Sequence, residues 1–214
     1  MVGAADAAAP TLSSVGQQGR HPTATFSAPR SDFDSVYVAS KPDRATDGSF
    51  LTENVKELDI LTDSEIQSGR WTDERQLDPG TYWVMLRASP DLVACFRDDF
   101  NIDPGCADGF SNVLPLTIPE PPIRYSARVT TYRYSREASL RLTATPLGEK
   151  RAYRACYRLA SGRNRCLNGS LDGYDWNSSA DDTLTITTRN LPRTATFSWY
   201  VAGKRVAIKR VHIR

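Results

Sequence analysis

The chain has 214 residues, of which 40% are hydrophobic and 24% charged, as is usual for a globular protein. No apolar stretch reaches the roughly 20 residues that a membrane-spanning helix needs, so membrane insertion is not expected. The net charge of +2 conceals two unlike halves: residues 1–119 carry 9 basic and 18 acidic side chains, and residues 120–214 carry 18 and 7. The length suits two domains of about 100 residues each.

The first nine residues lack the apolar core of a signal peptide. They are predicted to form a flexible N-terminal segment. Residues 10–119 are predicted to be β-rich, because short alternating runs are separated by turn residues. A helical turn is expected within 58–66, where Thr62-x-x-Glu65 matches a capping box. Three prolines within 119–122 predict a short semi-rigid linker, which divides the chain at about 119/120. Strands are expected at 23–29, 36–38, 82–86 and 114–118.

Several of these runs resemble a known family. The run Leu77-Asp-Pro-Gly-Thr-Tyr82, followed by alternating aliphatic residues, resembles the turn into a late strand of fibronectin type III domains. Residues 25–29 resemble an early strand of that family, and residues 111–118 resemble its last strand. The resemblance implies a two-sheet β-sandwich for residues 10–119, although Tyr82 comes one residue early and 41–70 is long and irregular. Cysteine-bearing repeats of this kind resemble those of exported actinobacterial proteins.

Residues 120–214 are also predicted to be β-rich. A tight turn containing Gly203 predicts a hairpin between two alternating strands. The inward apolar set then changes from Val206 and Ile208 to Val211 and Ile213, which predicts a β-bulge between them. The half resembles an immunoglobulin-like sandwich in architecture. The predicted fold class is therefore all-β, with two tandem β-sandwich domains, the first fibronectin type III-like and the second immunoglobulin-like. Strands are expected at 138–144, 183–187 and within 195–208.

Four cysteines fall into two close pairs, one in each half: Cys95 with Cys106, and Cys156 with Cys166. This arrangement favours two local disulfides and thus a secreted or cell-surface protein, with free cytosolic thiols as the alternative. Structural zinc sites space their ligands two to four residues apart, which does not match these pairs. Four cysteines allow three connectivities, and the sequence does not choose among them.

The acidic run between Cys95 and Cys106 resembles the start of a calcium loop. Asp99, Asn101 and Asp103 place oxygen ligands at alternate positions. However, proline stands sixth, where such a loop needs glycine, and phenylalanine stands twelfth, where a bidentate glutamate would close the site. The run is therefore interpreted as a disulfide-closed sandwich loop, and a weak calcium site is the alternative. No other cofactor is expected.

Catalysis is not expected. The two histidines, His21 and His212, lie in no recognisable arrangement with a nucleophile and a third group. Phosphate-binding glycine loops, nucleophile elbows and zinc-protease motifs are missing from the sequence.

A candidate binding segment is found in the second half. In an extended run Tyr174 and Trp176 would point the same way, so that both rings could stack on a sugar while Asp172 and Asp175 bond its hydroxyls. The alternative is structural: Trp176 covers the end of the sandwich and the acids form turns.

Arginine dominates the basic residues of 120–214, and tyrosines are interleaved with them. This composition favours contact with a polyanion or acidic surface, although alternation along strands also predicts an ordinary solvated face. Specific nucleic-acid binding is not expected. The sequence thus predicts a non-catalytic extracellular spacer, adhesion or protein-interaction unit of a bacterial exported protein, whose partner is a protein or cell-surface polymer. The alternative is a carbohydrate- or polyanion-binding module that uses the C-terminal domain.

Overall fold

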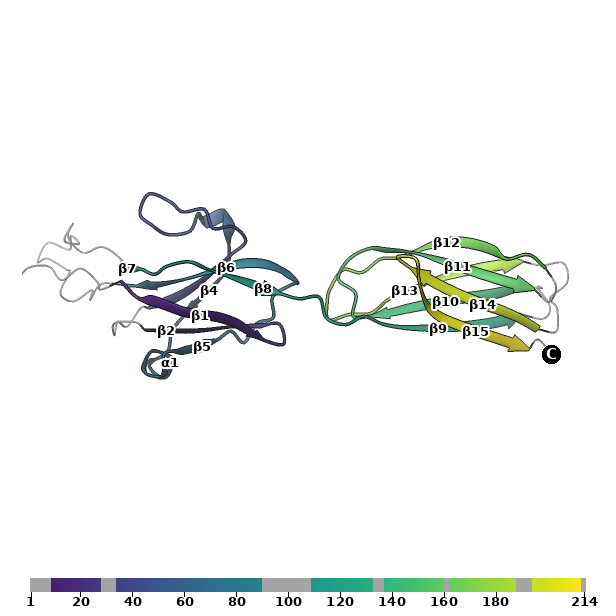
Figure 1. Ribbon diagram of the computed structural model, residues 1–214, viewed down its shortest axis with the longest axis horizontal. Helices are drawn as coiled ribbons and strands as arrows, with labels where there is room; N and C mark the ends of the chain where they lie inside the picture. The colour runs from purple at the N-terminus through teal and green to yellow at the C-terminus, as the bar shows by residue number, and fades with distance from the viewer. Residues whose placement is uncertain are drawn as a thin grey trace, which may run out of the picture. The chain divides into compact units, whose positions relative to one another are not determined.

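The computed structural model of the chain describes residues 9–27, 34–89, 109–132, 137–159, 162–187 and 194–212. These residues form antiparallel sheets, with one short α-helix and one 3₁₀ turn among them, so the all-β prediction is confirmed (Figure 1). The chain divides into two compact units, Met1–Glu120 and Pro121–Arg214, and each has its own hydrophobic core. No helix in the described ranges has the length and apolar character to cross a membrane.

The first unit contains two antiparallel sheets. One is three-stranded, in the order β1-β2-β5, and the other runs β4-β3-β6-β7, with β8 also paired to β6. The elements are β1 (Thr11–Gln18), β2 (His21–Ser27), β3 (Ser35–Ala39), the 3₁₀ turn (Thr52–Asn54), β4 (Val55–Ile60), α1 (Asp63–Ser68), β5 (Arg70–Thr72), β6 (Gly80–Ala88), β7 (Gly109–Phe110) and β8 (Leu114–Ile118).

Side chains from both sheets share the core of the first unit. Phe26 from β2 and Trp71 from β5 pack in one buried cluster with Val36 of β3 and Leu86 of β6. Because alternate residues of a strand point to opposite faces, one face of each sheet supplies this layer. The unit is therefore a β-sandwich.

The outer face of β3 and β6 is also covered. Met85 is fully buried there in a second small cluster with Ala39 and Phe50. Arg44, on the segment that leads to the 3₁₀ turn, donates to the carbonyl oxygen of Ser111 at 2.7 Å. This contact ties the segment 40–54 to the loop before β8. Because the segment covers the outer face, both faces of β3 and β6 are largely buried.

The helical prediction for 58–66 is right in its second part and wrong in its first. Thr62 caps α1, and its backbone N–H bonds the Glu65 side chain at 2.8 Å in the expected capping box. Leu58 and Ile60 belong to β4 instead, and they face solvent with exposed fractions of 49% and 60%. Glu57 and Asp59 point inward, and Arg75 after β5 and Trp71 of β5 provide partners for their carboxylates.

The second unit has the same strand order as the first. Its first, second and fifth strands form the sheet β13-β10-β9, and the others form the sheet β12-β11-β14-β15. The elements are β9 (Arg124–Tyr132), β10 (Glu137–Thr145), β11 (Arg151–Leu159), β12 (Arg165–Leu171), β13 (Ala180–Thr187), β14 (Thr194–Val201) and β15 (Lys204–His212).

The core of the second unit lies between these two sheets. Leu140 and Leu142 of β10 are fully buried with Phe197 and Trp199 of β14. Tyr153 and Tyr157 of β11 also point into this core, so the alternation along β11 leaves Arg154 and Arg158 on the outside.

The predicted hairpin and bulge both occur, but the bulge lies earlier than expected. Ala202 and Gly203 form the two-residue turn, both with positive φ (48° and 75°), as a type I′ hairpin requires. Trp199 pairs with Ala207 and Tyr200 with Arg205, so the extra residue of the bulge is Val206. The expected inward position of Ile208 is therefore wrong: Ile208 is 47% exposed, and Ala207 packs against the core instead.

Candidate functional site

The outer face of the sheet β12-β11-β14-β15 carries four exposed arginines. Arg154 and Arg158 lie on β11, opposite in direction to the buried tyrosines of that strand. Arg205 pairs with Tyr200 and Arg210 with Thr196 on β14, and those two residues in turn pair with Arg154 and Arg158. Strand geometry places the four at the corners of a patch of about 13 by 10 Å. We call this patch the arginine face.

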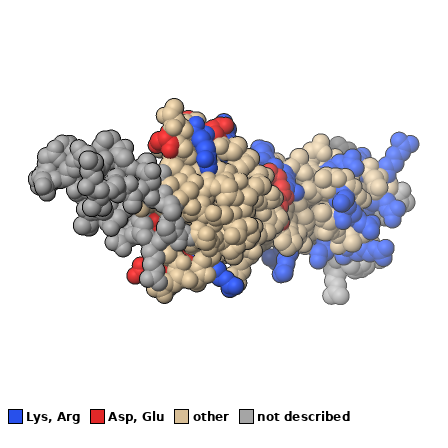
Figure 2. Space-filling model, turned by 60° about the vertical axis from the view of Figure 1, so that its left-hand side comes forward, with Lys and Arg blue, Asp and Glu red and all other residues tan. Residues whose placement is uncertain are grey.

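These arginines differ from other basic residues of the second unit. Within the described part of the chain, none of the four makes an ion pair, whereas Arg141 pairs with Asp181, Arg151 with Glu149 and Lys150 with Asp172. Figure 2 shows Lys and Arg side chains gathered over this unit on the side drawn. The unit's acidic side chains therefore do not neutralise the arginine face.

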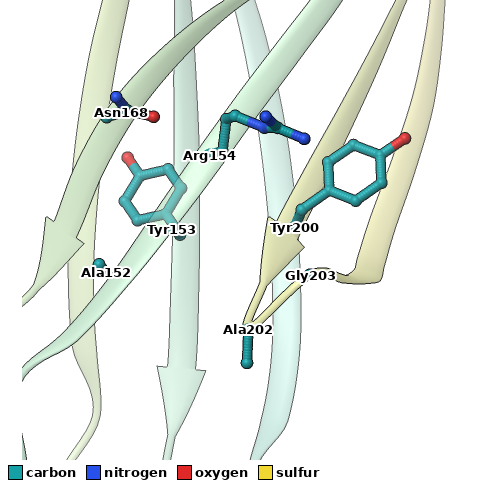
Figure 3. A pocket seen from close by; sticks show the side chains of 7 residues that line it. All are labelled: Ala152, Tyr153, Arg154, Asn168, Tyr200, Ala202 and Gly203. Carbon is teal, nitrogen blue, oxygen red and sulfur yellow. The ribbon is translucent and has the colours of Figure 1, made fainter.

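A pocket lies at one end of the arginine face (Figure 3). It has a volume of about 380 Å³ and lies along the cross-strand row Asn168, Arg154 and Tyr200. The Arg154 guanidinium carbon is 5.8 Å from the centre of the Tyr200 ring, within the range of a cation–π contact. The remaining lining comes from Ala152, Tyr153, Ala202 and Gly203.

A disulfide joins Cys156 and Cys166 on the same face. The two residues are direct cross-strand partners on β11 and β12, with Cα atoms 4.0 Å apart. The next outward pair along these strands is Arg154 with Asn168. The covalent link therefore holds together the two strands that place the arginine and the amide side by side.

Behind the pocket, a buried tyrosine connects the two sheets of the sandwich. The Tyr153 hydroxyl donates to Asp182 at 3.0 Å, and the same carboxylate oxygen accepts the backbone N–H of Ser170 at 3.2 Å. Burial, followed by the hydrogen bond to the Asp182 carboxylate, raises the pKa of Tyr153 well above its ordinary value. Tyr153 is therefore a neutral structural donor beneath the exposed row.

The segment with the sequence-predicted binding residues packs against the turn before β11. Asp175 pairs with Leu147, and Leu147 donates its backbone N–H to the Ser178 carbonyl at 3.0 Å. The Trp176 ring lies so close to Gly148 that a Cβ on that glycine would be 2.3 Å from it. The extended run assumed for these residues is absent, since Trp176 lies in a turn, while Tyr174 is 88% exposed.

The two acids of this segment are engaged locally. Asp172 accepts from Lys150 and from the Ser170 hydroxyl, each at 3.1 Å, and these contacts lower its pKa. Asp175 accepts the backbone N–H of Asn177 at 2.9 Å, which closes an Asx turn. The structure therefore places Asp172, Tyr174, Asp175 and Trp176 in one short segment, with their carboxylates in local contacts.

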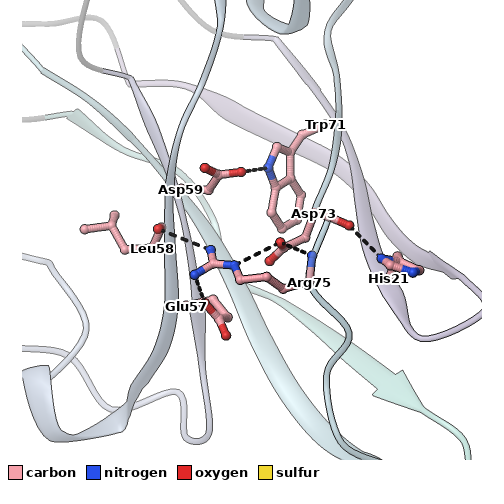
Figure 4. A network of polar contacts seen from close by, with 7 residues as sticks. All are labelled: His21, Glu57, Leu58, Asp59, Trp71, Asp73 and Arg75. Atoms are coloured by element: carbon pink, nitrogen blue, oxygen red, sulfur yellow. Dashed lines mark hydrogen bonds and ion pairs between the residues drawn. The ribbon is translucent and has the colours of Figure 1, made fainter. Parts of the chain in front are cut away.

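A polar network in the first unit has a similar structural role (Figure 4). Arg75 forms ion pairs with Glu57 of β4 and with Asp73, which follows β5. The Trp71 indole N–H donates to Asp59 at 2.9 Å, so a second contact joins the edges of the two sheets. His21 Nδ1 lies 3.0 Å from the Asp73 carbonyl oxygen, to which it donates. This network closes one edge of the sandwich, and its histidine contacts the Asp73 backbone and the Gln76 side chain.

The remaining predicted site residues lie outside the described ranges. These are Cys95 and Cys106 of the expected first disulfide and Asp99, Asn101 and Asp103 of the calcium alternative. In the described ranges, no group of three or more His, Cys, Asp or Glu side chains is placed to hold a metal ion.

Sequence reasoning predicted contact of residues 120–214 with a polyanion or acidic surface, but it did not single out these four arginines or the pocket beside them. The alternation of 151–159 was a usable signal, because it separates Arg154 and Arg158 from the apolar positions of the same strand. Asn168 and Tyr200 come from other strands, and only the register between strands brings them beside Arg154.

Comparisons with known proteins identify no close relative. No protein-family model matches the chain, and neither does any curated protein. Among solved structures, the chicken interferon gamma receptor alpha chain is similar with a TM-score of 0.34 and 11% identity, over 97% of this chain and 98% of that one. The chicken CNTN1 FN1–FN3 domains are similar with a TM-score of 0.31 and 18% identity, over 96% of this chain and 66% of that one. With both scores below 0.5, the fold assignment rests on the strand topology.

Proposed function

We propose that this chain is a non-catalytic interaction module of a secreted or cell-surface protein, and that its second unit contacts an acidic partner through the arginine face. The observation that carries the proposal is the set of four exposed arginines on one sheet face, without an ion pair in the described ranges. The planar guanidinium suits two-point contact with carboxylate, sulfate or phosphate groups. A partner that repeats such groups engages several corners of the patch at once.

The first unit, in this proposal, is a spacer or protein-contact domain of fibronectin type III type over residues 10–119. The second is an immunoglobulin-like domain over 120–214. Residues 1–8 of the predicted N-terminal segment lie outside the described ranges. The Cys156–Cys166 disulfide fits an oxidising compartment outside the cytosol. A non-catalytic role fits the contact of His21 with backbone and the ion pairs of Asp172 and Asp181.

Titration of the whole chain with heparin over a series of salt concentrations tests the proposal. We expect binding that weakens steeply with salt, and a slope of log K against log salt that falls by roughly one for each arginine removed. The variants are Arg158→Ala and Arg210→Ala, and the control is Arg128→Ala, which removes an exposed arginine from the outer face of the other sheet. Equal losses in all three variants, or no binding by the unaltered chain, would contradict the proposed face.

A further inference from the structure

The pocket on the arginine face combines three side chains whose polar groups are unengaged. The Asn168 amide, the Tyr200 hydroxyl and the Arg154 guanidinium make no hydrogen bond or ion pair within the part of the chain that the structure describes. Their strands are adjacent, so sheet register fixes the three in one row. The volume of about 380 Å³ is near the lower end of the roughly 300–1,000 Å³ typical of small-molecule sites.

Each of the three groups suits a different part of one ligand. The Arg154 guanidinium carbon lies 5.8 Å from the centre of the Tyr200 ring, and no carboxylate in the described ranges pairs with its N–H groups, so these groups are open to a carboxylate of a ligand. The exposed part of the Tyr200 ring offers an apolar surface with a hydroxyl at its edge. The Asn168 amide both donates and accepts, as hydroxyl groups of a sugar require.

The rest of the lining leaves room for a ring. Ala152 and Gly203, which lie beside the row, carry small or absent side chains. Ala202 has a φ of 48°, in the left-handed region that glycine or asparagine adopts more readily. This conformation costs an alanine about 1 kcal/mol or more. Its methyl group leaves the end of the pocket free of a longer side chain.

We propose that this pocket binds one acidic sugar unit of a polysaccharide, with its carboxylate on Arg154, its ring against Tyr200 and a hydroxyl on Asn168. This inference rests on the proposed function, and it names the ligand class of the same face. An acidic peptide would use the arginines alone, since its carboxylates gain nothing from the ring or the amide. A polymer with uronate units uses all three groups and then extends over Arg158, Arg205 and Arg210.

Calorimetric titration of the whole chain with four probes of matched chain length tests the assignment: oligogalacturonate, polyglutamate, oligothymidylate and neutral dextran. We expect oligogalacturonate to bind at least about fivefold more tightly than polyglutamate, which corresponds to one additional hydrogen bond or ring contact. Tyr200→Ala and Asn168→Ala should each remove that advantage, and Arg154→Lys should reduce it while the charge is kept. Arg158→Ala should weaken oligogalacturonate and polyglutamate equally. Near-ultraviolet circular dichroism establishes that each variant is folded.

The outcomes separate the inference from the function on which it rests. Failure of all three charged probes to bind refutes both. Equal binding of oligogalacturonate and polyglutamate, unaffected by Tyr200→Ala and Asn168→Ala, overturns the pocket and leaves the arginine face in place. Preferential binding of oligothymidylate that depends on Tyr200 assigns the face to nucleic acid and overturns the sugar. Loss of oligogalacturonate binding in Tyr174→Ala, with Tyr200→Ala unaffected, moves the sugar site to the 172–176 segment.

Discussion

Substitution of Gly173 by alanine tests the docking of the 172–179 segment on the turn before β11. A Cβ at this position would lie 2.2 Å from the backbone carbonyl oxygen of Leu147, closer than any real contact allows. No rotamer change relieves a clash with backbone, so the segment has to move away. Overpacking of this kind costs about 1–3 kcal/mol, and the alanine returns roughly 0.4–1 kcal/mol by restricting the unfolded chain.

The middle of these ranges gives an expected net loss of about 1.3 kcal/mol, which lowers the urea midpoint of the second unit by roughly 0.7 M at an m-value of about 2 kcal/mol/M. The indole NMR signals of Trp176 and Trp199 report this unit separately within the whole chain. Gly148→Ala should cost less, about 1 kcal/mol, because the ring of Trp176 can swing aside. Gly80→Ala is the matched control, since its nearest neighbour would be Tyr82 at an ordinary 3.6 Å. An unchanged midpoint in Gly173→Ala would refute the docked arrangement.

Three further measurements test other contacts. Replacement of both Cys156 and Cys166 by serine should lower the stability of the second unit by about 3 kcal/mol, read from its urea midpoint, because the bond spans only 10 positions of sequence. The pKa of Tyr153 is raised in the folded state, so above pH 10 the folded chain keeps a proton that the unfolded chain releases. The free energy of unfolding should therefore fall as pH rises above about 10, and it should fall less in Tyr153→Phe. Thr62→Ala removes the capping box of α1 and should cost the first unit about 1 kcal/mol, measured through the indole signal of Trp71. A flat pH profile, or unchanged midpoints, would count against these contacts.

Strands whose apolar residues all face the core were predictable from the sequence. In β10 each apolar residue, such as Leu140 and Leu142, alternates with a polar one, and the alternation marks both the strand and its buried side. The capping box of α1 was predictable for a similar reason, because Thr62 and Glu65 form it without help from the rest of the fold.

Strand β4 was hidden because its polarity is reversed. Its apolar residues Leu58 and Ile60 face solvent, while Glu57 and Asp59 face inward toward Arg75 and Trp71. Strand prediction from alternation assumes that the apolar side chains face the core. In β4 the carboxylates face inward instead, because residues more than ten positions away in the sequence pair with them. Only the packing of the two sheets reveals those partners.

The pocket was hidden for a different reason. Asn168, Arg154 and Tyr200 are separated by 14 and 46 positions in the sequence, and each is unremarkable in its own strand. The row exists because the registers of two strand pairs coincide. The candidate residues 172–176, which are adjacent in the sequence, were correspondingly easy to notice.

The extra residue at Val206 has a genetic consequence. Arg205 and Arg210 are five positions apart, an odd separation that a regular strand would place on opposite faces. The bulge between them restores a common side, with Ala207 inward and Ile208 outward. Loss of a single codon at this point would keep every arginine in the protein and yet turn Arg210 toward the core. Homologues that share the binding surface should therefore preserve the spacing of this segment more strictly than the identity of the residue at 206.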